Sequence, residues 1–260
     1  MMPVRSHRNR QVVEAARLHR AGERRERGRT LIEGPHLLEE ALSAGVTPLS
    51  LFALEDDEPT RALAASRHFD LVLVDDTGLA RLAGTTSPRG PVAVIEIPEP
   101  RDIVAHGVVV AWGVGDPGNV GTMIRTAAGF GWAFGYTEGT ADPWAPKVLR
   151  AGAGAHFRTG VIPIDSLAQL EGLGYQTLAA VVVGGSAPAA LATGRYAVLI
   201  GDESSGLPQA VAASATSRVT IPMPGGMESL NAATAAGIMV YELSKDQVPE
   251  TKYGERQRPL

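Results

Sequence analysis

Three loop-like segments in the second half of the chain constrain the fold more than any other feature. Each follows a short apolar run and breaks into Gly, Pro, Asn or Ser; they are GDPGNVGTMIRTAAGFG (115–131), LIGDESSGLP (199–208) and IPMPGGMESLNAATAAGIMVYEL (221–243). The first and third continue into helix-like runs rich in small residues. Loops at the carboxyl ends of parallel strands line one crevice, which is where α/β proteins bind ligands. The sequence therefore predicts an α/β fold and an enzyme whose site is built from three loops.

The order of apolar runs and helix-like segments predicts two domains. Residues 1–97 alternate between strand and helix patterns and indicate a small α/β domain. Residues 98–103 carry Pro and charge and are predicted to be a linker, and residues 104–260 form the second domain. In the small domain we expect one charged helix over 9–26, strands over 29–33, 47–54, 70–74 and 92–97, and helices over 36–45, 59–67 and 76–83. In the second domain we expect strands over 108–112, 133–137, 160–164, 176–183, 197–200 and 218–221, and helices over 119–130, 147–155, 166–172, 207–215 and 229–243.

Composition excludes several classes of protein. The chain has no Cys, so it has no disulfides, no thiolate metal site and no Cys nucleophile. No apolar stretch reaches the ~18 residues that a membrane span needs. The basic start of the chain is not followed by the apolar core of a secretory signal. We therefore expect a cytoplasmic protein.

Charge is distributed unevenly along the chain. Residues 1–30 contain nine Arg and three Glu, whereas the whole chain has a net charge of -4. A basic arm on an acidic body favours a polyanionic partner, because Lys and Arg placed on phosphates release condensed counterions. A solvated helix face explains the same arginines equally well. Charge alone therefore leaves nucleic-acid binding open.

The first loop also matches a competing pattern. Gly113, Gly115 and Gly118 fit the dinucleotide fingerprint G-x-G-x-x-G, and Glu138 follows 20 residues after the last glycine. Pro117 lies inside this fingerprint and lacks the backbone donor that a pyrophosphate would need. The fingerprint also gives the two later loops no role. A nicotinamide-dependent oxidoreductase is therefore an alternative that the residues support less well.

Polar residues of the three loops each allow a functional and a structural interpretation. Asn119 stands where a helix N-cap belongs, so its side chain either caps the helix or contacts a substrate. Arg125 lies among small residues and needs either a carboxylate partner or an anionic ligand. Glu203 is either a solvated loop residue or orients a ribose, an amine or Arg125. Ser229 or Asn231 caps the last helix, and a Ser without a paired His or Lys is a poor nucleophile. The spacing of possible ligands predicts no metal site.

Taken together, the three segments resemble the signature motifs of the SPOUT superfamily, and within it the SpoU/TrmH class of RNA ribose 2'-O-methyltransferases. The motifs PGNVGTMIRTA, IGDESSGL and IPMPGGMESLNAATAAGI occur in the family's order within roughly residues 104–245. Residues 5–97, which contain RTLIEGPHLLEEAL, resemble the small ribosomal-protein-like substrate-binding domain that many members carry in front. The thiostrepton-resistance type of rRNA methyltransferase has the same two-domain layout.

The resemblance implies a fold, a cofactor and partners. It implies a parallel sheet with a deep trefoil knot near its carboxyl end, S-adenosylmethionine bound among the knot loops, and a homodimer whose active site combines both subunits. The substrate is expected to be structured RNA, and the front domain favours ribosomal RNA over transfer RNA. A tRNA 2'-O-methyltransferase and a non-catalytic RNA-binding paralogue are the alternatives.

The resemblance also assigns residues to the site. We expect Arg125 to bind a phosphate and polarise the ribose hydroxyl, since a guanidinium stays protonated in proteins. Asp202 stands where the family usually has Asn, and Ala151 where many members have Ser. The catalytic positions carried over are Asn119, Arg125, Glu203, Ser229 and Asn231. The cofactor contacts carried over are Leu199, Ile200, Gly201, Ile221, Pro222, Met223, Ser229 and Leu230.

Overall fold

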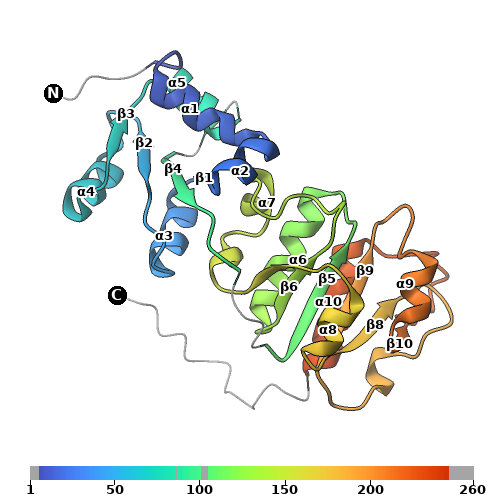
Figure 1. Cartoon of the computed structure of the whole chain (residues 1–260). Coiled ribbons are helices and arrows are strands. Elements are labelled where there is room, and N and C mark those ends of the chain that lie inside the picture. The colour runs from blue at the N-terminus through green and yellow to red at the C-terminus, as the bar shows by residue number, and fades with distance from the viewer. Residues whose placement is uncertain (1–5, 86, 89, 101–104, 246–260) are drawn as a thin grey trace.

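The structure is a computed structural model that describes residues 6–85, 87–88, 90–100 and 105–245. Two sheets organise these residues, and they lie in separate halves of the molecule (Figure 1). The small sheet uses strands between Arg29 and Glu96, and the large sheet uses strands between Gly107 and Val219. Of the expected linker 98–103, residues 101–103 lie outside the described part of the chain.

The small sheet has four strands in the order β1-β4-β2-β3. β4 pairs antiparallel with β1 and β2, and β2 pairs parallel with β3. Residues of α1 and α5 pack on one face of this sheet, and residues of α3 and α4 pack on the other. The strands are β1 Arg29–Glu33, β2 Ser50–Ala53, β3 Leu71–Leu73 and β4 Val92–Glu96. The helices are α1 Arg10–Ala16, η1 Arg17–His19, α2 Ala21–Arg27, α3 Pro35–Ser43, α4 Glu58–Arg67 and α5 Asp76–Ala83.

The single charged helix expected over residues 9–26 is wrong. The chain forms α1, one 3-10 turn and α2, and Arg20 between them is extended, with φ -87° and ψ 130°. Leu18 and Arg24 are both buried, at 2% and 3% exposure. On one straight helix, residues six apart would face directions about 120° apart. The break allows Leu18 to join the small-domain core while Arg24 points at the other domain.

The large sheet has six strands, all parallel, in the order β10-β8-β9-β5-β6-β7. β8 ends at Ala180, so the strand expected over 176–183 is too long. Val182 and Val183, the last residues of its apolar run, are 54% and 78% exposed. The strands are β5 Gly107–Trp112, β6 Ala133–Tyr136, β7 Val161–Pro163, β8 Gln176–Ala180, β9 Tyr196–Gly201 and β10 Ser217–Val219. The helices are α6 Pro117–Gly129, α7 Pro146–Ala151, η2 Ala155–Phe157, α8 Leu167–Gly172, η3 Pro188–Ala190, α9 Gln209–Ser214 and α10 Ala232–Ser244.

Helices cover both faces of the large sheet, which explains its continuous apolar strands. Val109 of β5 belongs to the core formed with α6 and α10, whereas Val108 and Val110 belong to the core formed with α8 and α9. Side chains alternate along a strand, so an unbroken apolar run buries both faces. Because all six strands are parallel, their carboxyl ends share one edge, and the three predicted loops start there.

Candidate active site

The start of α6 brings Asn119 into the site. Asp116 is the N-cap of this helix, and its Oδ1 accepts a hydrogen bond of 2.8 Å from the backbone N–H of Asn119. Pro117 occupies the first helical position, where its missing N–H is not needed. The interpretation of Asn119 as the cap is therefore wrong. Its side chain remains available for other contacts.

Asn119, Glu203 and Asn231 form one hydrogen-bonded cluster. The Asn119 side chain, 8% exposed, donates from Nδ2 to Glu203 Oε1. Asn231 Nδ2 donates to Asn119 Oδ1 and to the same Glu203 oxygen, both at 2.9 Å. Each of the three motifs thus supplies one member of the cluster. The structure brings together three of the five predicted catalytic residues.

Asn231 also determines where the last helix begins. Its Oδ1 accepts hydrogen bonds from the backbone N–H groups of Ala233 and Thr234, at 3.0 and 3.1 Å, so it is the N-cap of α10. The cap fixes the side chain, and its Nδ2 then points at Glu203. A carboxylate held by two amides keeps its remaining acceptor sites oriented. Such a group can accept or orient the hydrogen of a substrate hydroxyl.

Asp202 joins the first motif to the second. Its Oδ1 accepts hydrogen bonds from the Ser204 backbone N–H at 3.0 Å and the Ser204 hydroxyl at 2.6 Å. Its Oδ2 accepts from the backbone N–H of Gly115 at 3.4 Å. The Ser204 hydroxyl, followed by the backbone N–H groups of Ser204 and Gly115, lowers the pKa of Asp202. The carboxylate is therefore ionised at neutral pH.

A cavity of about 350 Å³, here called the motif cavity, opens beside the cluster. Leu199 of the predicted cofactor contacts is fully buried within β9, and neither it nor Pro222 lines this cavity. The sequence did not predict the part of the lining that comes from the end of β8 and from α10. The predicted contacts that do line it are Ile200, Gly201, Ile221, Met223, Ser229 and Leu230. The missed residues are Ala180, Val181, Val182, Ala232, Ala235 and Met239.

Gly201 is required where the chain folds back on itself in the second motif. A Cβ at this position would collide with the Gly206 carbonyl group and the Leu207 backbone nitrogen. Gly121 of α6 has a similar role, since a Cβ there would lie 2.5 Å from Ala151 Cβ and 2.7 Å from the Val148 oxygen. Ala151, the position where many family members have Ser, therefore packs directly on α6. Nothing in the structure relates Ala151 to substrate preference.

Arg125 and Ser229 stand apart from the cluster. Arg125 is exposed and lies six residues beyond Asn119 on α6, about 9 Å along the axis and on another side of the helix. Within the described residues it makes no hydrogen bond and no ion pair, so the intrachain ion pair considered for it is not formed. Ser229 is exposed and lines the motif cavity. One chain by itself thus does not assemble all five predicted positions.

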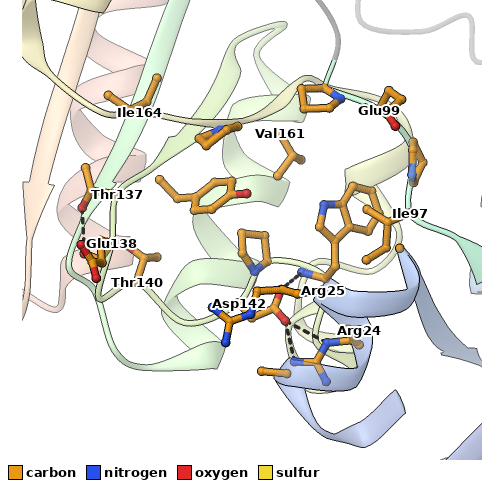
Figure 2. Close-up of a pocket in the computed structure, with 18 of the residues that line it drawn as sticks. Arg24, Arg25, Ile97, Glu99, Thr137, Glu138, Thr140, Asp142, Val161 and Ile164 are labelled. Carbon is orange, nitrogen blue, oxygen red and sulfur yellow. Dashed lines mark hydrogen bonds and ion pairs between the residues drawn. The ribbon is translucent and has the colours of Figure 1, made fainter. Parts of the chain in front are cut away.

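A second cavity, of about 590 Å³, lies at the junction of the two domains and is called the junction cavity here (Figure 2). It opens at the ends of β6 and β7, and α2 forms its other wall. Arg24 donates from Nε to Asp142 Oδ2 at 2.8 Å (Figure 2). Its Nη1 donates to the carbonyls of Leu18 and His19. Glu138, the ribose ligand of the dinucleotide alternative, lines this cavity and not the motif cavity. The neighbouring Thr137 Oγ1 accepts a hydrogen bond of 3.0 Å from the Gly113 N–H, so the first loop lies beside the segment that carries Glu138.

Further contacts join the domains around the junction cavity. Thr30 Oγ1 of β1 donates to the Trp144 carbonyl at 2.6 Å, and both groups are buried. Glu33 of β1 pairs with Arg150 of α7 at 3.0 Å, and Glu40 of α3 pairs with Arg158 at 2.5 Å. The last pair lowers the pKa of Glu40. No sequence signal predicted these pairs, because their members are more than 100 residues apart.

His156 is buried beside this junction. It is 3% exposed, its ring centroid lies 5.5 Å from that of Trp144, and neither ring nitrogen has a hydrogen-bond partner among the described residues. Burial lowers its pKa to about 4. The imidazole is therefore neutral at physiological pH. Sequence reasoning gave His156 no role.

Among the described residues, no three His, Cys, Asp or Glu side chains gather as metal ligands would. In that same part of the chain, no helix is both long and apolar enough to cross a membrane.

Comparisons with known proteins agree with this architecture. Residues 106–241 match the SpoU rRNA Methylase family, and residues 9–93 match the MRM3-like substrate binding domain. The 23S rRNA (guanosine(2553)-2'-O)-methyltransferase RlmP of Bacillus subtilis is 31% identical over 249 residues, covering 94% of this chain and 99% of that protein. An uncharacterized tRNA/rRNA methyltransferase of Synechocystis is 33% identical over 266 residues, with 94% of each chain covered.

Solved structures show the same fold. A putative RNA methyltransferase of the TrmH family from Porphyromonas gingivalis has a TM-score of 0.79 at 29% identity, covering 91% of this chain and 97% of that one. The SpoU methyltransferase AviRb from Streptomyces viridochromogenes has a TM-score of 0.84 at 24% identity, covering 92% and 98%. The fold thus defines a class of methyltransferases in which a substrate-binding domain precedes a parallel-sheet catalytic domain in the chain. The chain belongs to the SpoU rRNA methylase family, and the resemblance inferred from its three motifs is confirmed.

Proposed function

We propose that this protein transfers a methyl group from S-adenosylmethionine to a ribose 2'-hydroxyl of ribosomal RNA. One observation carries the proposal: Asn119, Glu203 and Asn231 converge from the three family motifs at the edge of the motif cavity. The relative RlmP, which matches over nearly its whole length, is named for 2'-O-methylation of 23S rRNA. A domain that matches a substrate-binding family precedes the site. An rRNA substrate favours a cytoplasmic location.

The motif cavity has features that fit the cofactor. Ile200, Ile221, Met223 and Leu230 offer an apolar wall to an adenine ring, and the missing side chain of Gly201 exposes backbone. Asp202 and Glu203 provide carboxylates on the same lining, where a ribose, an amine or a sulfonium group would find acceptors. Bound S-adenosylmethionine supplies an electrophilic methyl group on a positively charged sulfur.

The residues of the cluster would align the ribose hydroxyl with that methyl group. Methyl transfer is a displacement in which the hydroxyl oxygen must approach in line, so orientation supplies much of the rate acceleration. Glu203, held by the two amides, would accept a hydrogen bond from the hydroxyl. Ser229, on the same cavity, would contact the ribose or the cofactor. Arg125 would bind the neighbouring phosphate as a fixed cation.

We also propose a homodimer in which Arg125 reaches the site of the partner subunit. Arg125 lies on the exposed side of α6, away from the Asn119 cluster of its own chain. Phe130 at the end of α6 and Ile238 and Tyr241 of α10 leave apolar surface exposed, and the rings of Phe130 and Tyr241 meet edge to face at 6.3 Å. Exposed apolar residues gathered on two adjacent helices are typical of a protein interface. The trefoil knot expected from the resemblance remains a prediction.

Complementation between two inactive variants tests the shared site. Asn119→Ala and Arg125→Ala homodimers should both be inactive. A 1:1 mixture that re-forms dimers at random should recover about a quarter of the wild-type activity, because about half of the dimers are then mixed and one of their two sites is intact. The mixed dimer carries one site with both residues intact only if Arg125 acts across the interface. No recovery, with mixed dimers verified by mass spectrometry, would place both residues in a single-chain site. A monomer in analytical ultracentrifugation would contradict the dimer itself.

Calorimetric titration followed by a methyl-transfer assay tests the function. S-adenosylmethionine and S-adenosylhomocysteine should bind to the purified protein, and NADH should not. Tritiated methyl groups should then enter ribosomal RNA, and alkaline hydrolysis should leave the modified linkage intact because a 2'-O-methyl group blocks cleavage. Label in transfer RNA alone would favour the tRNA alternative. Cofactor binding without transfer to either RNA would favour the non-catalytic paralogue.

A further inference from the structure

The lining of the motif cavity carries negative charge without a compensating cation. Asp202 and Glu203 both line the cavity, and none of the described lining residues is Lys, Arg or His. The junction cavity differs, because its lining contains Arg24 and Arg25 as well as carboxylates. Opposite charges attract over several ångströms even near solvent. A ligand that carries a positive charge is therefore favoured in the motif cavity over a neutral ligand of the same shape.

The two carboxylates have different tasks. Glu203 Oε1 is engaged by both amides of the cluster, which orients this side chain toward Asn119 and Asn231. The Asp202 carboxylate instead accepts hydrogen bonds from Gly115 and Ser204, and within the described residues it has no hydrogen bond to the side chains of Asn119 and Asn231. Its hydrogen bonds come from uncharged donors, so they hold the carboxylate in place without cancelling its charge. The ionised state of Asp202 at neutral pH follows from the same contacts.

We propose that Asp202 is a specificity-determining residue that makes the motif cavity select the positively charged methyl donor over its uncharged product. The inference rests on the proposed function. In the reaction the bond between sulfur and the methyl carbon breaks, a bond between that carbon and the ribose oxygen forms, and the hydroxyl proton is released to water. Sulfur keeps the electron pair and becomes an uncharged thioether. The attraction by Asp202 thus acts before transfer and ends with it, which favours release of the product.

Asp202 is not a member of the hydrogen-bond cluster, so its charge can be removed without breaking the bonds between Asn119, Glu203 and Asn231. The resembling motif usually has Asn here, which preserves the shape of the side chain but not its charge. Asp202→Asn is therefore the smallest change that removes the proposed effect. Donor and product share the same adenosine and amino-acid groups, so a distorted loop would weaken both together. The ratio of their dissociation constants isolates the charge.

The test is calorimetric titration of the full-length protein with S-adenosylmethionine and with S-adenosylhomocysteine at low and high salt. Asp202→Asn should reduce the preference for the donor by roughly threefold or more at low salt. High salt should shrink this preference more in the wild type than in the variant, because ions screen exposed charges and the variant keeps only the carboxylate of Glu203 in the cavity. Asp165→Asn removes the same charge from an exposed residue of the junction cavity and should leave the ratio unaltered.

Two results would overturn the proposal. If Asp202→Asn weakens both ligands by the same factor, the carboxylate only shapes the loop. If the ratio and its salt dependence stay at the wild-type value, the charge does not act on the ligand. Failure of the wild type to bind either ligand would instead overturn the proposed function, and the charge selection with it.

Discussion

The motif cavity and the junction cavity open at the same edge of the large sheet but are built in different ways. The motif cavity is lined by the segments between β8, β9 and β10 and the elements that come after them, and by α10. The junction cavity combines the ends of β6 and β7 with α2, a helix from the other domain. In the first, polar side chains from three motifs bond to one another. In the second, charged side chains cross between domains.

This difference indicates that the motif cavity serves the reaction, whereas the junction cavity marks where the two domains are held together. Asn119, Glu203 and Asn231 bond to one another at the edge of a cavity that Glu203 lines, so they are positioned for a ligand. Arg24 and Asp142 form a closed pair whose donors and acceptors are used within the protein. We therefore expect changes in the motif cavity to affect turnover and changes in the junction to affect stability.

The largest effect is expected for Asn119→Ala. The change removes the donor to Glu203 and the acceptor for Asn231, so the carboxylate loses its orientation. Loss of one preorganised hydrogen-bonding group in an active site lowers kcat roughly 100-fold or more. Single-turnover methyl transfer with saturating cofactor measures it. Thr122→Ala, an exposed residue one turn further along α6, is the control and should retain the wild-type rate. A variant that keeps more than half the activity would remove Asn119 from the mechanism.

The sequence predicts the motif cavity better than the junction cavity. The polar residues of the site lie in segments that follow strand ends and contain Gly or Pro, and helix and strand periodicity place those ends at one edge. The cap of α6 was misassigned because Asp116 and Asn119 are both good capping residues, although Pro117 between them indicates where the helix begins. The junction depends on pairs such as Glu40 with Arg158, 118 residues apart, and no local pattern encodes such a pair. Arg125 was expected at the site, yet one chain leaves it exposed.

A smaller effect, on stability rather than turnover, is expected for Arg24→Ala. Removing this 3% exposed guanidinium leaves Asp142 and two carbonyl groups without their donor. Breaking a buried ion pair by deleting one partner costs about 3 kcal/mol. Urea unfolding followed by circular dichroism measures the change in the free energy of unfolding. Arg25→Ala is the matched control: the adjacent arginine is exposed and forms no ion pair among the described residues, so its loss should change stability by less than about 0.5 kcal/mol. Equal losses in the two variants would contradict the structural role of Arg24.

The last prediction uses pH to weaken the junction without changing the motif cavity. His156 is neutral in the folded protein because burial depresses its pKa to about 4, whereas the unfolded chain has the ordinary value of 6.5. Between these values the unfolded state binds a proton that the folded state does not, so stability is complete above pH 6.5 and falls as the pH drops toward 4. A shift of this size corresponds to about 3 kcal/mol at most, reached only near pH 4.

His156→Leu tests this pH dependence, since leucine fills a similar volume and has no proton to bind. Urea unfolding between pH 7 and pH 4 should show a shallower loss of stability in the variant than in the wild type, with the two curves diverging below pH 6.5. His106→Gln, a change at an exposed histidine, should leave the wild-type curve unaltered. Parallel curves for wild type and His156→Leu would mean that the imidazole takes up its proton in the folded state. The junction would then be less tightly closed around His156 than its 3% exposure indicates.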